Sequence, residues 1–243
     1  MLRKFKADLH VHTCLSPCTE LDMSPKGILS SAKKKDIDIL GICDHNSSEN
    51  SLAIMKAAMG MDIHVIPGME VTSQEEVHVV ALFDGVGNAL KLQDLVYKNL
   101  PGKNDQEAFG MQVIVNEKEE VLGFNEKLLI GATTIPFEEI LRLIHSFDGV
   151  AIASHIDREA FGIIGQLGFI PEDLELDALE ISPRITFAEA EMKYNYNYPI
   201  TCSSDAHYPD DIGNGFTCFL LNEGTVAEIK KALKNEDGRK VMH

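Results

Sequence analysis

The sequence predicts an α/β fold in which seven strands and their covering helices form a closed or nearly closed barrel. Two observations predict this fold. Short runs rich in β-branched and other apolar residues alternate with segments of helical pattern, which is typical of a parallel sheet covered by helices. The chain has 243 residues, close to the roughly 250 that a (β/α) barrel usually needs in one domain. A flat, doubly wound sheet is the alternative that the same alternation allows.

Seven segments have the length and composition of buried strands. They lie at residues 5–11, 37–43, 63–67, 77–83, 150–154, 178–181 and 200–203, with residues 216–221 as a candidate eighth strand. Because helical segments separate most of them, crossover connections would keep these strands largely parallel in one sheet.

Five helices are predicted among these strands and after the last one. The first has the clearest start, because Ser24 is a good N-cap and Pro25 suits the first helical position. The predicted helices cover residues 25–35, 51–59, 136–147, 186–194 and 225–234. Residues 236–243 are predicted to form a simple solvated end.

Residues 84–135 interrupt the alternation. They contain a helical segment at 89–100 and a predicted hairpin formed by residues 112–115 and 120–124. We interpret the segment as an insertion on a single barrel domain that spans residues 1–243, rather than as a second domain. Long connections of this kind often act as lids, and a packing role outside the site is equally open.

Charge and cysteine content disfavour several classes of protein. The net charge of −16 argues against binding to long nucleic acid or to an anionic membrane, although short oligonucleotides stay open. Since bound metal ions can reverse the local charge of a pocket, we expect a small phosphorylated substrate as the partner. Five scattered cysteines do not indicate a secreted disulfide scaffold. With neither a signal-peptide pattern nor a long apolar run, a cytoplasmic location is the simplest expectation.

Six of the nine histidines lie at or near the ends of predicted strands, where barrel enzymes carry their active sites. His10 and His12 have the i, i+2 spacing that points two strand side chains to one face, and Asp205 and His207 repeat it. Such imidazole and carboxylate groups are the usual ligands of zinc and similar ions. The whole set is His10, His12, His45, Glu70, His78, His155, Asp205 and His207. Only His78 stands near the start of its predicted strand.

The order of these motifs resembles the PHP (polymerase and histidinol phosphatase) superfamily. The matching motifs are Asp8-Leu9-His10-Val11-His12-Thr13, Asp44-His45, Gly68-Met69-Glu70, Ser154-His155 and Ser204-Asp205-Ala206-His207. They span residues 8–207, nearly the whole chain. The resemblance implies a distorted (β/α)7 barrel with a trinuclear centre of divalent ions, most often zinc, manganese or iron.

The resemblance also implies which residues hold each ion. The ligands of the first ion would be His10, His12, Glu70 and Asp205. The second ion would share Glu70 and be completed by His78 and His155. The third would be held by His45 and His207.

One further family ligand, a His or Asp, usually follows the HxH pair by five or six residues. Here those positions are Pro17 and Cys18. Cys18 could bind an ion as a thiolate, with Glu20 or Asp22 as nearby substitutes.

Two arginines are candidates for binding phosphate. Arg158 lies three residues after His155, and Arg184 follows the predicted strand at 178–181. The guanidinium group matches the planar array of phosphate oxygens. A surface salt bridge is the alternative for both arginines.

Together these residues predict a metal-dependent phosphoesterase that hydrolyses a small phosphorylated metabolite or nucleotide with a water activated by two or three ions. As shared ligands, Glu70 and Asp205 are the candidate catalytic residues. Asp8 and Asp44 either orient ligating histidines or are ordinary solvated carboxylates. Two rival functions are an amidohydrolase-like C–N hydrolase and a metal-binding accessory domain without turnover.

Overall fold

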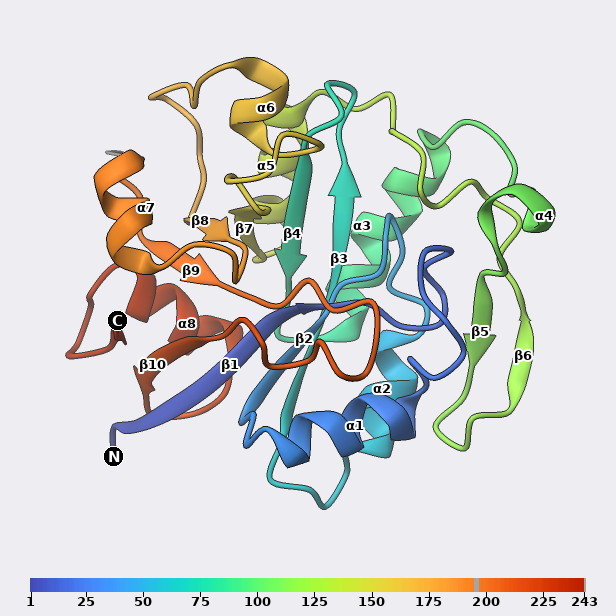
Figure 1. Cartoon of the computed structure of the whole chain (residues 1–243), viewed down its shortest axis with the longest axis horizontal. Coiled ribbons are helices and arrows are strands. Elements are labelled where there is room, and N and C mark those ends of the chain that lie inside the picture. The colour runs from blue at the N-terminus through green and yellow to red at the C-terminus, as the bar shows by residue number, and fades with distance from the viewer. Residues whose placement is uncertain (195–196, 243) are drawn as a thin grey trace.

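The computed structural model describes residues 1–194 and 197–242. Within them, nine strands form one sheet in the order β11-β10-β1-β2-β3-β4-β7-β8-β9, which curls into a nearly closed barrel (Figure 1). Their bounds are β1 Arg3–Val11, β2 Ile39–Ile42, β3 His64–Thr72, β4 His78–Leu82, β7 Val150–Ala153, β8 Ala178–Ile181, β9 Ile200–Cys202, β10 Thr217–Leu221 and β11 Lys240–Met242. All seven predicted strands and the candidate eighth are confirmed, and with them the distorted barrel.

The barrel closes where the end of β1 meets the segment that follows β9. Val11 and Ala206 form an isolated parallel bridge, and the His12 amide donates to the Ala206 carbonyl over 3.1 Å. β10 then pairs antiparallel with the outer edge of β1. The predicted solvated end is wrong in part, because β11 pairs with β10 and so protects that strand's open edge. His243 lies outside the described residues.

Two strands differ from a regular (β/α) repeat. β4 runs antiparallel to both of its neighbours, β3 and β7, whereas the pairs β1–β2, β2–β3, β7–β8 and β8–β9 are parallel. β3 also continues five residues past Pro67, which the sequence suggested as its end. Pro67 is tolerated inside the strand because it pairs with Ile42 and contributes its carbonyl, which accepts from the Phe83 amide over 3.0 Å. Glu70 therefore lies within β3.

Most helices pack on the outside of the barrel, whereas the last helix of the chain covers the apolar end of the barrel interior. Their bounds are α1 Pro25–Lys34, α2 Ser51–Ala57, α3 Val86–Lys98, α4 Gln106–Phe109, α5 Phe137–Ser146, α6 Ile163–Leu167, α7 Phe187–Lys193 and α8 Val226–Leu233. Ser24 caps α1 as predicted, by accepting from the Gly27 amide over 3.2 Å. None of these helices in the described ranges is long and apolar enough to cross a membrane.

One end of the barrel interior is apolar, and the other end, where the parallel strands finish, is polar. Alternate side chains of each strand face inward, so Ile39, Ile66, Leu82 and Ala178 form one buried cluster with residues of α8. Following the same alternation toward the other end of the barrel leads to the inward positions His45, Glu70, His78 and Glu180. The polar site therefore lies at one end of the barrel, next to the packed apolar core.

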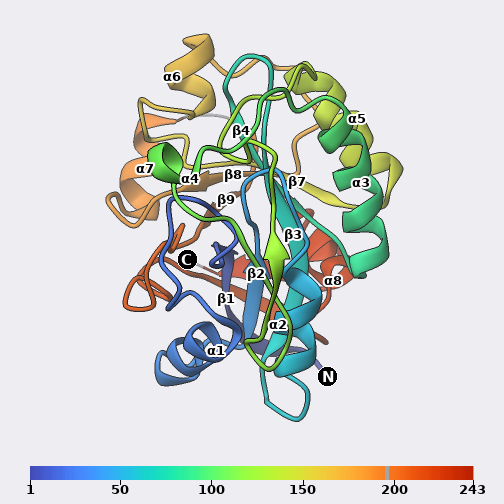
Figure 2. The ribbon, with the colours of Figure 1, turned by 90° about the vertical axis from the view of Figure 1, so that its right-hand side faces the viewer.

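Residues 84–135 contain the predicted hairpin as β5 (Val113–Val115) and β6 (Val121–Phe124), which are labelled in Figure 1. In Figure 2 the green chain of this segment runs across the front of the barrel strands. The Asn50 side chain bonds to the backbone of Val113 and Val115 over 3.0 Å each. These contacts tie the hairpin to the barrel beside the histidine cluster. The role of this segment as a lid stays a prediction.

Candidate metal centre

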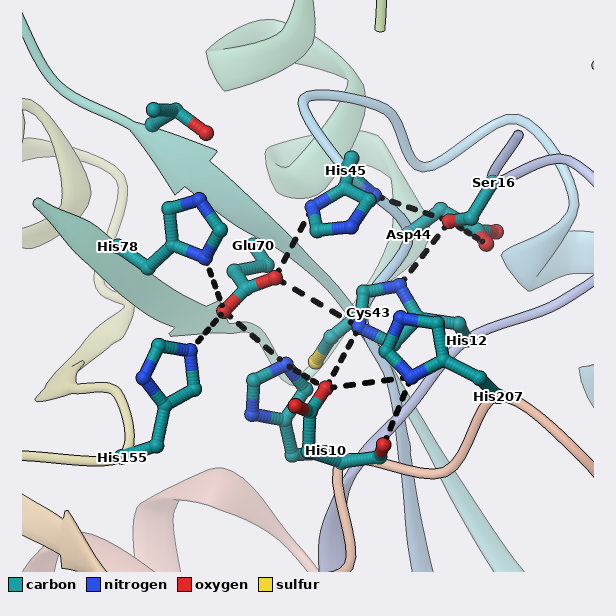
Figure 3. Close-up of polar contacts among 12 residues, drawn as sticks. His10, His12, Ser16, Cys43, Asp44, His45, Glu70, His78, His155 and His207 are labelled. Carbon is teal, nitrogen blue, oxygen red and sulfur yellow. Dashed lines mark hydrogen bonds and ion pairs between the residues drawn. The ribbon is translucent and has the colours of Figure 1, made fainter. Parts of the chain in front are cut away.

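Glu70 lies at the centre of a ring of histidines (Figure 3). Its side chain is only 1% exposed. Glu70 Oε1 lies 2.9 Å from His78 Nδ1, 3.2 Å from His155 Nε2 and 3.3 Å from His10 Nε2. Three imidazole nitrogens from three strands or strand ends therefore face one carboxylate oxygen.

The second oxygen of Glu70 faces two more histidines. Glu70 Oε2 lies 3.0 Å from His45 Nδ1 and 3.6 Å from His12 Nε2. His12 Nε2 is also 3.0 Å from Asp205 Oδ1, which lies 3.4 Å from His10 Nε2. Glu70 thus borders two groups of ligand atoms at once, as a carboxylate that bridges two ions must.

Three overlapping groups of ligand atoms have the spacing that a metal ion needs. In each group the atoms all lie within 4.8 Å of one another. The groups are His10, His12, Glu70 and Asp205; His45, Glu70 and His78; and His12, His45 and His207. The first is the set that the family resemblance implies for the first ion. In the other two groups, His45 stands with Glu70 and His78 where the resemblance implied His155, and His12 joins His45 and His207.

The donor atoms of these groups fit a multi-metal site. His10 Nε2, His45 Nδ1 and His78 Nδ1 are buried and lie within 3.3 Å of the Glu70 oxygens, but none of them forms a hydrogen bond of regular geometry within the described residues. A buried polar atom without a partner is costly, and a bound cation removes that cost. Nitrogen and carboxylate donors suit zinc, manganese or iron alike.

The reversed direction of β4 explains the position of His78. His78 is the first residue of β4 and pairs with Thr72, the last residue of β3. Because β4 runs antiparallel to its neighbours, its first residue lies at the same rim as the last residues of the parallel strands. His78 therefore joins the other histidines although it starts its strand.

An irregularity in β1 points the HxH pair inward. Leu9 faces the barrel interior, so strict alternation would turn His10 and His12 outward. The pairing of β1 with β2 shifts between Asp8 and Val11, and this shift reverses the alternation. Gly41 of β2 allows the close approach, since a Cβ there would lie 2.3 Å from the Leu9 carbonyl oxygen.

Two of the predicted ligands have unusual backbone conformations. His155 has φ 29° and Asp205 has φ 50°, in the left-handed region that most residues avoid. Strained residues of this kind persist where surrounding contacts hold them, often at functional sites. The two residues turn at the ends of β7 and β9, which directs both side chains over the barrel mouth.

Further polar residues contact the outer nitrogens of the HxH pair. His12 Nδ1 lies 3.0 Å from Ser16 Oγ, which donates to Asp44 Oδ1 over 2.7 Å. Asp44 therefore acts on His12 through Ser16 rather than on the adjacent His45. Asp8 accepts from the Ser204 amide over 3.0 Å and so fixes the loop that carries Asp205; no histidine ring bonds to it within the part of the chain that the structure describes.

The outer partner of His10 is Glu180, which the sequence analysis missed. His10 Nδ1 lies 2.9 Å from Glu180 Oε1, and the side chain of Glu180 is 1% exposed. The available signal was a lone carboxylate inside the apolar strand Ala178–Ile181, because an unpaired charge is rarely buried in this way.

The charges of the cluster depend on one another. Burial acts against ionisation, but the imidazoles of His78 and His10 lower the pKa of Glu70 well below its usual range. His10 and His12 do the same to the pKa of Asp205, again against burial. Both carboxylates therefore stay ionised in the barrel mouth, where they attract cations.

Cys18 lies in the same cavity as His45 and His207. Burial acts to raise the pKa of Cys18, but these two imidazoles lower it to about 6. The suggested substitutes Glu20 and Asp22 are exposed and are absent from the cavity lining in the described structure. Of these three candidates, Cys18 is thus the one that lines the cavity together with His45 and His207.

The two arginines are placed differently. Arg158 lines the cavity, whose volume is about 210 Å³, together with Ile130 and Phe161. Its Nη1 donates to Asp205 Oδ2 over 2.5 Å, while its Nε has no hydrogen-bond partner in the described structure. Arg184 follows β8, but its side chain is exposed and does not line this cavity.

Comparison with known protein families identifies the family of this chain. The PHP domain pattern matches residues 8–166, and the PHP-associated pattern matches residues 189–237. The chain belongs to the PHP domain family. The buried His, Glu and Asp groups fit a multi-metal site of the kind that PHP enzymes have.

Similar proteins share either part of the sequence or the fold of this PHP protein. An uncharacterized protein of Methanocaldococcus jannaschii is 28% identical over 102 residues, which are 38% of this chain and 60% of that protein. The lesion-specific endonuclease Endonuclease Q of Pyrococcus furiosus has a TM-score of 0.72 and 20% identity over 99% of this chain, but only 58% of its own. A protein of Bifidobacterium adolescentis assigned as a metal-dependent phosphoesterase has a TM-score of 0.54 and 15% identity, over 84% of this chain and 88% of its own.

The expectation of a small phosphorylated partner without long nucleic acid is overturned by these comparisons. A second Endonuclease Q structure contains a 27-mer duplex substrate with an abasic lesion at the active site, and it has a TM-score of 0.70 and 19% identity over 99% of this chain and 59% of its own. A protein with a similar fold thus acts on duplex DNA. The error arose because a net charge sums over the whole surface and says little about one cavity that collects cations.

Proposed function

We propose that this PHP protein is a phosphoesterase that cleaves a phosphodiester bond in nucleic acid. One observation carries the proposal: a carboxylate that faces five imidazoles lies in the same cavity as an arginine with an unpaired nitrogen. The proposed metal ligands are His10, His12, Cys18, His45, Glu70, His78, His155, Asp205 and His207.

Each group has a distinct part in this proposal. Bound divalent ions would supply an activated water and neutralise the charge of the reacting phosphate. Glu70 and Asp205, whose ligand atoms lie in one group with those of His10 and His12, would balance the charge of those ions. Arg158 can direct its free Nε–H toward a phosphate oxygen while Nη1 stays on Asp205. An amide substrate offers no comparable anion, which makes the C–N hydrolase the weaker reading.

The size of the cavity supports a substrate that extends beyond it. A volume of about 210 Å³ is smaller than the roughly 300–1,000 Å³ of sites that enclose a ligand. Ions would fill part of it, leaving room for a phosphoester group and little else. The exposed Arg184, at the end of the neighbouring strand β8, is a further cation for the substrate outside the cavity.

We expect the purified protein to cleave oligonucleotides when manganese or zinc is added. The assay compares end-labelled duplexes with and without an abasic site, the single strand, and a chromogenic phosphomonoester. Glu70→Gln, purified in the same way, controls for contaminating nucleases. Strand cleavage by the wild type alone supports the proposal. Turnover of phosphomonoesters or amides with no cleavage of any oligonucleotide would contradict it.

We expect three ions per chain in the wild type and two in Cys18→Ala, because Cys18 would complete the site of His45 and His207. Elemental analysis after dialysis measures both numbers. Cys18→Asp should bind three ions again, since it restores a ligand type common in the family. Cys218→Ala is the matched control, because Cys218 is also half-buried but lies in β10. Three ions in Cys18→Ala would remove Cys18 from the centre.

A further inference from the structure

We propose that Glu180 is a positioning residue that fixes the orientation and tautomer of His10 for metal binding. The inference rests on the proposed metal centre and extends it outward by one layer of residues. Neither the family match nor the motifs in the sequence include Glu180.

Glu180 contacts two of the proposed ligand residues. Its Oε1 lies 2.9 Å from His10 Nδ1 and accepts from the His155 backbone amide over 3.3 Å. The Glu180 carbonyl accepts from the Ile156 amide over 2.8 Å. One buried residue of β8 thus holds the His10 ring and the strained turn at His155.

The two nitrogens of His10 face different partners. Nδ1 points to Glu180, whereas Nε2 lies 3.3 Å from Glu70 and 3.4 Å from Asp205, among the candidate ligand atoms. A neutral imidazole carries one N–H. A carboxylate at Nδ1 places that hydrogen there, which leaves the lone pair of Nε2 directed at the centre and makes it a better donor.

The surroundings of Glu180 favour this role over core packing. Glu180 shares the inward face of β8 with the fully buried Ala178 of the apolar interior cluster, and Glu180 Oε2 has no hydrogen-bond partner in the described structure. A leucine would fill such a position without the cost of burying a charge. The carboxylate is explained if the His10 contact and the cations beyond it offset that cost.

The chain offers a matched control just before the same strand. Asp177 precedes β8 and lies 2.9 Å from His145 Nε2, so it forms a carboxylate–histidine pair apart from the candidate metal ligands. It also accepts from the Ala151 amide over 2.8 Å. Neither Asp177 nor His145 belongs to the described groups of metal-ligand atoms.

The experiment is a zinc titration of the metal-free full chain against a chromophoric chelator, for wild type, Glu180→Gln and Asp177→Asn. We expect Glu180→Gln to weaken the tightest zinc site about 10- to 100-fold, as loss of such outer partners does elsewhere, and Asp177→Asn to leave it unchanged. Wild-type affinity in Glu180→Gln, or an equal loss in Asp177→Asn, would overturn the inference. If the wild type bound no zinc, the metal centre and the proposed function would fail as well.

A measurement on the wild type covers the case in which Glu180→Gln does not fold. In the zinc-loaded protein, nitrogen-edited NMR should show a protected His10 Nδ1 proton shifted downfield by its bond to a carboxylate. Absence of a proton on Nδ1 would refute the positioning role whatever the variant does.

Discussion

Glu70→Gln is expected to lower hydrolysis by about 10³-fold or more and to reduce the number of bound metal ions. The amide has nearly the same shape but lacks the charge that two ions would share. Metal-based charge stabilisation is worth several kcal/mol, and each 1.36 kcal/mol is about tenfold in rate. Steady-state rates with added metal, together with elemental analysis, measure both effects.

The expected loss for Glu70→Gln must be distinguished from misfolding. Circular dichroism of the metal-free protein should be that of the wild type, because Glu70 is one side chain in an intact strand. Glu228→Gln is the control, since it removes a carboxylate that pairs with Arg239 on the far side of the barrel. Near wild-type turnover of Glu70→Gln with a full set of ions would show that Glu70 has no catalytic part.

Arg158→Ala is expected to lower kcat/KM for a phosphodiester by about two orders of magnitude. A hydrogen bond to a charged group contributes about 1.5–3 kcal/mol, and Arg158 is the arginine in the cavity wall. Arg158→Lys should recover only part of the loss, because the ammonium group lacks the planar fork. Metal content should stay the same, since Asp205 Oδ1 faces His10 and His12 without help from the arginine.

The exposed Arg184 is the matched comparison for Arg158. Arg184→Ala is expected to reduce kcat/KM by less, because an exposed cation interacts with phosphate through water and is screened by salt. Kinetics at low and high salt separate the two arginines, since only the Arg184 effect should shrink strongly. Equal kcat/KM for the wild type and Arg158→Ala would exclude Arg158 from substrate binding.

Much of the fold was predictable because its signals are local. The N-cap at Ser24 involves a hydrogen bond that spans three residues, and the apolar runs of the strands are readable without knowing their neighbours. The candidate ligands were readable for another reason. Histidines and carboxylates at strand ends are chemically distinct from the core around them, and their order along the chain matches a family pattern.

What only the tertiary structure decided depends on strand direction, register and contacts between distant residues. The reversal of β4 places His78 at the rim, and the shift in β1 turns His10 and His12 inward. Glu180 and His10 are 170 residues apart in sequence, so no local pattern pairs them. The sequence by itself therefore determined which chemical groups the barrel carries, whereas long-range pairing decided how they face one another, because backbone pairing sets the direction and face of every strand side chain.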